Sequence, residues 1–146
     1  MEMRVNHEDC VKVIGERIKL YGPFENSMPS YAQCMEAVEI HKLKTYYAPS
    51  HKTEKQVAEM LRALIALKAA RILTTPDSEV ASIKDSYIDL ANYLFFTKKL
   101  KYFEITLSPA LFNSSIERPS RMPFEELCNR INSEGLFAKG VEYESL

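Results

Sequence analysis

The sequence predicts a mainly α-helical protein, with a four-helix bundle over residues 1–101 and a small C-terminal extension over residues 102–146. Apolar residues recur at spacings of three and four along most of the first hundred residues, which is typical of amphipathic helices. Turns containing Gly or Pro separate these stretches, and the pattern changes after residue 101. A chain of 146 residues has the length of one domain.

The composition excludes several classes of protein. The chain is 46% hydrophobic and 27% charged with a formal net charge of −1, whereas disordered chains are less apolar or farther from neutrality. This balance also argues against a dedicated nucleic-acid binder, which carries an excess of Lys and Arg. We expect no signal peptide, because the first ten residues contain no apolar core region, and no transmembrane helix, because no 18-residue window is free of charge. The three scattered cysteines, Cys10, Cys34 and Cys128, indicate a reducing, cytoplasmic compartment.

The first helix is predicted over residues 7–21. Asn6 can cap its N-terminus, and two acidic residues in the first turn suit the positive end of the helix dipole. Gly22 followed by Pro23 is a typical stop signal. The apolar stripe of this helix comprises Cys10, Val11, Ile14, Ile18 and Tyr21.

Three further helices follow in the predicted bundle. A loop over residues 22–27 leads to a second helix at about 30–47, which ends before Ala48-Pro49-Ser50. The third helix is predicted over residues 54–73, because Thr53-Glu54-Lys55-Gln56 fits a capping box. The fourth is predicted over residues 80–99.

The extension is predicted to contain a short β-hairpin and one short helix. Its strands are expected at 102–107 and 141–144, with a loop at 113–123 and a helix at 124–132 between them. We expect it to pack against the bundle or against a partner subunit.

The third helix carries two cations on its predicted apolar stripe. That stripe comprises Val57, Met60, Leu61, Leu64 and Ile72, and Lys68 and Arg71 fall on the same face at about 100° per residue. The alanines at 63, 66 and 70 are expected on the other sides. A charge on an apolar stripe is costly unless it is paired or reaches water. These two residues therefore either end the stripe or line a polar pocket.

The fourth helix has the complementary feature. Its apolar face comprises Ile83, Tyr87, Leu90, Ala91 and Leu94. Asp85 and Asp89 lie one turn apart on the opposite face, together with Asn92 and Phe96, while Tyr93 lies on the flank. Since the helix is apolar over most of its circumference, we expect it to be central and buried. Buried carboxylates need cations, so the two helices are expected to meet through these groups.

This juxtaposition has two interpretations. In the first, Lys68 and Arg71 form a structural ion-pair network with Asp85 and Asp89. In the second, the same residues form a nucleotide pocket, because a guanidinium fork matches phosphate oxygens. The two carboxylates would then orient the cations or hold Mg²⁺, and a Mg²⁺-activated water would attack a phosphoanhydride.

Other residues fit the second interpretation as well as simpler ones. Glu36 and Glu39, three apart on the predicted second helix, are either a solvated face or the other half of a metal site. Arg17 and Tyr21, four apart, form either a helix-end contact or a lid over the pocket. In the lid interpretation, Asn26 contacts a base or sugar.

Part of the chain resembles a family of small phage and prophage proteins of unassigned function. The resemblance covers about residues 11–96 and is carried by Arg17 with Tyr21-Gly22-Pro23 and Asn26, by Leu67–Arg71, and by Asp85–Tyr93. The same block is distantly similar to the all-α NTP pyrophosphohydrolases, the MazG-like superfamily. That similarity implies a helical, oligomeric, Mg²⁺-dependent enzyme, with Asp89 matching the acidic end of the second motif. Asp85 is four residues from Asp89 rather than three, and Ser86 stands at the expected Glu.

The sequence thus predicts a helical homo-oligomer that binds a nucleotide or a nucleotide-derived signal. Lys68 and Arg71 would bind phosphate, and Asn92, Tyr93 and Tyr21 would shape the base or ribose side, with Arg17 also contacting the ligand from the lid. Mg²⁺-dependent hydrolysis is left open, with Asp85 and Asp89 as its catalytic residues. If the protein is phage-encoded, it would act on the nucleotide pool or on a defence signal in the host cytoplasm. The rival is a non-enzymatic dimer that binds a host protein.

Overall fold

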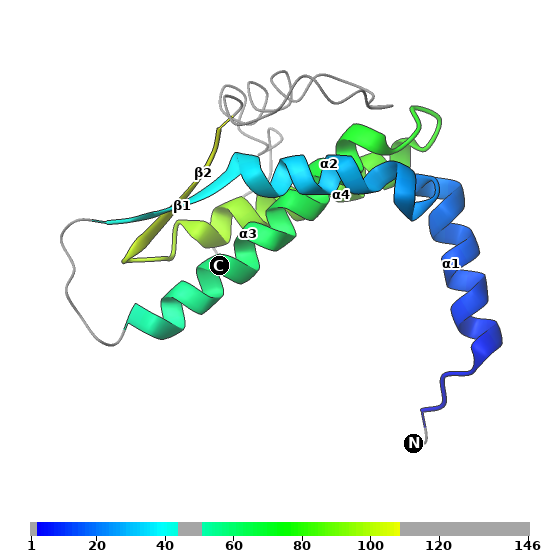
Figure 1. Ribbon diagram of the computed structural model, residues 1–146, viewed down its shortest axis with the longest axis horizontal. Helices are drawn as coiled ribbons and strands as arrows, with labels where there is room; N and C mark the ends of the chain where they lie inside the picture. Colours follow the sequence, from blue (N-terminus) through cyan, green and yellow to red (C-terminus); the bar gives the residue numbers. More distant parts are fainter. Residues whose placement is uncertain (1–2, 44–50, 109–146) are drawn as a thin grey trace.

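The computed structural model describes residues 3–43 and 51–108, which form four helices and a two-stranded sheet (Figure 1). This confirms the predicted fold class of a mainly helical core with a small hairpin-like addition. No helix in these two ranges has the length and apolarity needed to cross a membrane. In chain order the elements are α1 (His7–Tyr21), α2 (Phe24–Ala37), β1 (Val38–Lys42), α3 (His51–Thr74), α4 (Val80–Thr97) and β2 (Phe103–Leu107).

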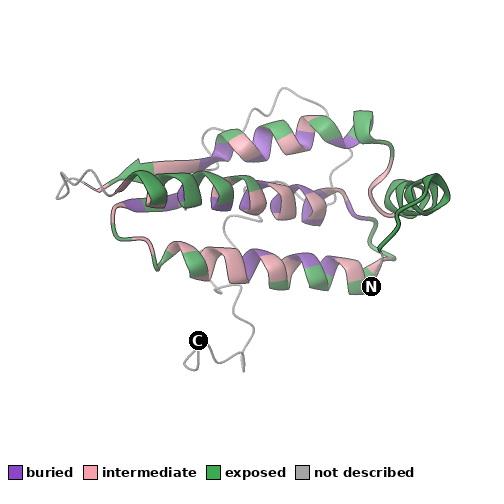
Figure 2. Ribbon diagram, turned by 90° about the horizontal axis from the view of Figure 1, so that it is seen from below, coloured by how far each residue is buried: buried purple, intermediate pink, exposed green. Residues whose placement is uncertain are grey.

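The core of the molecule is built around α3, which packs against both α2 and α4. Figure 2 shows that buried positions lie on the facing sides of these three helices. Four buried alanines of α3 let the neighbouring backbones approach closely, and larger side chains fill the space between them. The fully buried residues of α3 include Ala58, Ile65, Ala69, Ala70, Ile72 and Leu73.

The predicted apolar stripe of α3 is therefore only partly correct. Val57 and Met60 are exposed, with 54% of Met60 accessible, whereas Ala66 and Ala70 are buried. A helical projection at about 100° per residue groups the large apolar side chains on the buried face. Where two helices approach closely, however, small side chains such as alanine occupy that face. The α4 face was predicted correctly, since Ile83, Leu90 and Ala91 are buried and Tyr87 and Leu94 pack against the core. The expectation of a central, buried α4 is wrong, because α3 takes the central position and Ile88 and Phe96 of α4 are exposed.

The second helix differs most from its prediction. It begins at Phe24, inside the predicted loop, and it ends at Ala37, where the chain continues as strand β1. Arg62 of α3 fixes this junction: its Nη2 donates to the Met35 carbonyl and its Nε donates to the Val38 carbonyl, both at 2.6 Å. Because these carbonyls lie at a helix end, a cation is a favourable partner for them.

The two strands are antiparallel, and Ile40 lies opposite Ile105. Strand β2 was predicted at this position, but its observed partner is β1 rather than residues 141–144. The first strand of the predicted extension thus pairs with a strand that follows α2 directly. The predicted strand at 141–144, loop at 113–123 and helix at 124–132 lie outside the described residues.

Helix α1 follows its predicted bounds and stands apart from the other three (Figure 1). Asn6 and Asp9 form the capping box at its start, and Gly22 ends it with a φ of 76°, a conformation that other residues rarely adopt. No residue of α1 is buried. Helix α3, by contrast, already begins at His51, so the predicted capping box at Thr53 does not mark its start.

Candidate functional site

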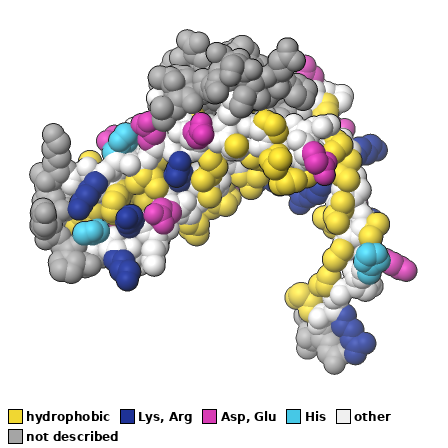
Figure 3. Space-filling model, viewed as in Figure 1, with side chains coloured by type: hydrophobic (Ala, Val, Ile, Leu, Met, Phe, Trp, Pro, Cys, Tyr) yellow, Lys and Arg dark blue, Asp and Glu magenta, His cyan; other side chains and the backbone are white. Residues whose placement is uncertain are grey.

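A groove lies in the angle between α1 and the body formed by α2 and α3. It encloses about 900 Å³ and is lined by 18 residues, most of them apolar. Figure 3 shows hydrophobic side chains along the inner side of this angle. Helix α2 contributes a row at spacings of four, three and four: Phe24, Met28, Tyr31 and Met35. We call this feature the α1–α2–α3 groove.

The aromatic floor of the groove is a stacked pair on α2. The rings of Phe24 and Tyr31 have centroids 6.3 Å apart and are inclined by 25°. They are seven residues apart, two helical turns, so the helix itself holds them on one face. The pair offers a flat apolar surface at which a planar group can stack.

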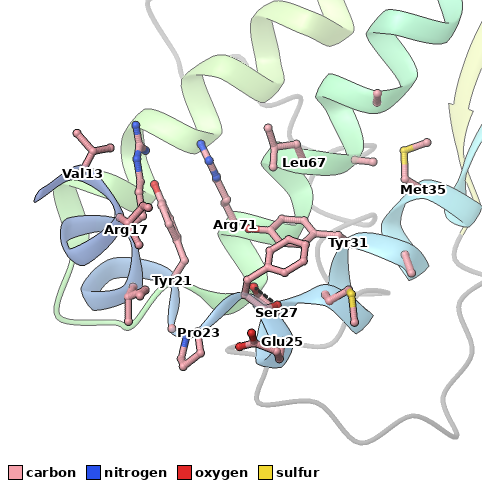
Figure 4. Close-up of a pocket in the computed structure, with 18 residues that line it drawn as sticks. Val13, Arg17, Tyr21, Pro23, Glu25, Ser27, Tyr31, Met35, Leu67 and Arg71 are labelled. Carbon is pink, nitrogen blue, oxygen red and sulfur yellow. Dashed lines mark hydrogen bonds between the residues drawn. The ribbon is translucent and has the colours of Figure 1, made fainter. Parts of the chain in front are cut away.

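A cationic cluster closes the end of the groove where α1 meets α3. The guanidinium carbon of Arg71 lies 4.7 Å from the centroid of the Tyr21 ring, within cation–π range. Figure 4 shows that the guanidinium ends of Arg17 and Arg71 and the hydroxyl of Tyr21 point to the same side. The Tyr21 hydroxyl lies 3.5 Å from the Ser82 Oγ of α4. We call Arg17, Tyr21 and Arg71 the cationic cluster.

Arg71 has hydrogen-bonding capacity that the described residues leave unused. Its Nε is buried and has no hydrogen-bond partner within residues 3–43 and 51–108. Burying an unpaired donor costs free energy, and a charged donor costs more than a neutral one. Its carbonyl is satisfied, because the Thr75 hydroxyl donates to it at 2.5 Å. The unpaired group is thus the side chain, which lines the groove.

The predicted polar contact between the third and fourth helices includes an ion pair between Lys68 and Asp89. The Lys68 Nζ lies 2.9 Å from the Asp89 carboxylate, with 14% of the lysine side chain and 44% of the aspartate side chain accessible. This pair follows the structural interpretation of the sequence. Arg71 does not join it but lines the groove on the α1 and α2 side.

The remaining predicted site residues are dispersed. Asp85 is exposed on α4, and Asn92 and Tyr93 are half-buried farther along the same helix, outside the groove lining. Asn26 lines a smaller cavity of about 260 Å³ that also borders Tyr21 and Gly22. The structure therefore places Arg17, Tyr21, Asn26 and Arg71 around the C-terminal end of α1, where they line the groove or the smaller cavity, and none of them takes part in the Lys68–Asp89 ion pair.

The predicted acidic pair on the second helix is wrong. Glu36 lies in the last turn of α2, whereas Glu39 lies in β1, because the helix ends at Ala37. The Glu39 carboxylate lies 3.2 Å from the Nε2 of His41, which also contacts the Thr106 hydroxyl at 2.8 Å. Among the described residues, no three His, Cys, Asp or Glu side chains gather as metal ligands would.

The apolar groove was not predicted from the sequence, although part of its signal is present there. Phe24 fell within the predicted loop and Met28 before the predicted helix start at about residue 30, so their helical spacing to Tyr31 was not counted. Pro29 lies inside the helix and favours a break in sequence-based reasoning. The aromatic spacing of seven between Phe24 and Tyr31 would have indicated a shared face.

Comparisons with known proteins add nothing to this geometry: no family model, no curated protein and no solved structure matches the chain.

Proposed function

We propose that this protein binds an organic phosphate of the nucleotide type in the α1–α2–α3 groove. The observation that carries the proposal is the Arg71 side chain at the end of an apolar cavity, with a buried Nε that has no hydrogen-bond partner among the described residues. A guanidinium presents donors in a fork that matches phosphate oxygens, and the Arg71 side chain lines the groove. Arg17, which points to the same side, supplies a second cation (Figure 4).

The rest of the groove suits the other half of such a ligand. The stacked rings of Phe24 and Tyr31 provide an apolar surface for a base, and base–aromatic stacking contributes about 1–3 kcal/mol. Glu25 also lines the groove and can accept a hydrogen bond from an amino group of a base. The phosphate of such a ligand would thus face the two arginines, and its base would face the rings of Phe24 and Tyr31 in the same cavity.

This proposal moves the predicted pocket from the α3–α4 interface to the α1 side of α3. Lys68 is engaged with Asp89, so we assign it a structural role. We propose binding alone; hydrolysis through a Mg²⁺ ion at Asp85 and Asp89 remains a sequence prediction, and Asp89 would first have to leave Lys68.

A second candidate function is protein interaction without catalysis. It is favoured by one observation, the absence of any buried residue on α1. A partner that covers α1 would also cover part of the groove, and the identity of that partner is argued in the next subsection.

The test is thermal denaturation with a panel of nucleotides, each with and without Mg²⁺. A ligand at 100 times its Kd should raise the stability by about 2.7 kcal/mol. Arg71→Met keeps most of the apolar stem but removes the charged donors, so it should weaken binding about tenfold to a hundredfold. Lys12→Met is the matched control, because Lys12 is exposed on α1 and does not line the groove.

Two results would overturn the proposal. One is the absence of any shift across the panel. The other is binding that survives Arg71→Met but is lost in Lys68→Met, which would return the site to the α3–α4 interface.

A further inference from the structure

Helix α1 carries an apolar face that nothing in the described residues covers. It has 15 residues, none of them buried, and 57% of Ile14 is accessible. Val11, Val13 and Ile18 are also exposed on this helix. An isolated helix of about 12–15 residues is marginal in water, and most helical stability comes from packing of an amphipathic face. The helix therefore needs a second surface to be stable.

We propose that this surface is α1 of a second copy of the chain, laid antiparallel against α1 within the α1–α2–α3 groove. In a two-fold arrangement the same patch is used on both subunits. The exposed face of α1 is one wall of the groove, and α2 and α3 form the other. The partner's helix would thus contact both walls, and this copy's helix would do the same in the partner. Because a helix seated there takes up the space of the proposed phosphate ligand, the dimer and the ligand-bound form exclude each other.

The charges on α1 favour the antiparallel direction. Its first turn carries Glu8 and Asp9, whereas Arg17 and Lys19 lie near its end. Antiparallel pairing places the acidic end of one helix beside the basic end of the other, and it also opposes the two helix dipoles. Parallel pairing would place like charges together.

The size of the groove fits a helix of a second copy. A standard protein interface uses about 20–30 residues a side, and the groove alone is lined by 18. Val11 and Cys10, exposed on α1 outside that lining, extend the surface further. The apolar lining also agrees with the apolar centre of a stable dimer interface.

The first test measures the molar mass of the protein without ligand, so it is independent of the proposed phosphate binding. Light scattering after size exclusion should give a dimer for the wild type. The double substitution Ile14→Asp with Ile18→Asp should give a monomer whose body still melts cooperatively. Lys12→Asp, outside the groove lining, is the matched control and should remain a dimer. A wild-type monomer up to about 100 μM, well above the Kd of a micromolar complex, would overturn the proposal.

The second test measures the direction of pairing. In a background of Cys10→Ser and Cys128→Ser, one chain carries Val11→Cys and the other Ile18→Cys, and a short bis-maleimide links them. These positions lie three or four residues on either side of the helix midpoint, so antiparallel pairing brings them level. A mixture of the two variants should crosslink several times more than either variant alone. In an antiparallel pair the two copies of the same residue lie about 10 Å apart along the helix axis, since residues 11 and 18 are seven residues apart at about 1.5 Å per residue. Stronger self-crosslinking of each variant, or no crosslinking in a dimer, would overturn the antiparallel arrangement.

Discussion

The body around α3 and the projecting α1 are both amphipathic helical structures, yet they are held by different means. Helix α3 buries eight residues against its neighbours, whereas α1 buries none. The hydrophobic stripe of α1 is as regular as any in the chain. Periodicity therefore shows that a face is built for burial, but not which surface covers it. The residues proposed to bind phosphate lie where these two regions meet, at the cationic cluster.

The largest expected effect is a difference in the free energy of unfolding between two matched isoleucine substitutions, one in the body and one in α1. Ile65→Ala removes a fully buried side chain from α3 and should lower the free energy of unfolding by about 2–5 kcal/mol. Ile14→Ala removes the same atoms from an exposed site on α1 and should change it by no more than about 0.5 kcal/mol in dilute, monomeric protein. Urea denaturation measures both, and equal costs would contradict the division between body and projecting helix.

The next effect concerns the junction between α2 and β1. Arg62→Met removes two hydrogen bonds to the carbonyls of Met35 and Val38 while keeping most of the side-chain volume. Because the donor is charged, we expect a loss of about 1.5–3 kcal/mol in the same denaturation measurement. Arg62→Lys keeps the charge but cannot span both carbonyls, so its free energy of unfolding should lie between those of the wild type and Arg62→Met. A neutral Arg62→Met would show that the junction is set by packing alone.

A smaller effect should stay confined to α1. Asn6→Ala removes the side chain that accepts from the Asp9 amide at 2.9 Å, a cap contributing about 0.5–2 kcal/mol to its helix. Amide hydrogen exchange should speed up in α1 while the protection of α3 stays unchanged. If the exchange of α3 also accelerated, α1 would be part of the cooperative core.

The smallest effect is expected at the ion pair between α3 and α4. Asp89 is nearly half exposed, so solvent screens the pair and its contribution is about 0–1 kcal/mol. A double-mutant cycle with Lys68→Met and Asp89→Asn measures that coupling. A coupling of several kcal/mol would mean that the pair is central to the body rather than a surface link.

The sequence predicted correctly those helix ends at which a capping residue or a Gly-Pro pair stands. The bounds of α1 followed from Asn6 and the Gly22-Pro23 pair, and the start of α4 was also correct. Strand β1 was missed because Val38–Lys42 is short and pairs with residues more than 60 positions away. Its alternation of apolar and polar residues was present, but a helical pattern on the preceding residues concealed it.

The surroundings of Arg71 could be predicted only in part. A cation on an apolar stripe either ends the stripe or lines a pocket, and the structure places Arg71 in the lining of the groove. The choice between α4 and α1 as its neighbour depends on how whole helices pack, and no local pattern reports that. Lys68, three residues earlier and on the same predicted stripe, pairs with α4 instead.

The most direct test of the central claim is an isothermal titration of the wild type and Arg71→Met with the nucleotide that stabilises the protein most. The account predicts saturable binding to the wild type and an affinity about tenfold to a hundredfold lower for the variant, with Lys12→Met unchanged. Equal affinity for the wild type and Arg71→Met would contradict the assignment of the groove as a phosphate-binding site.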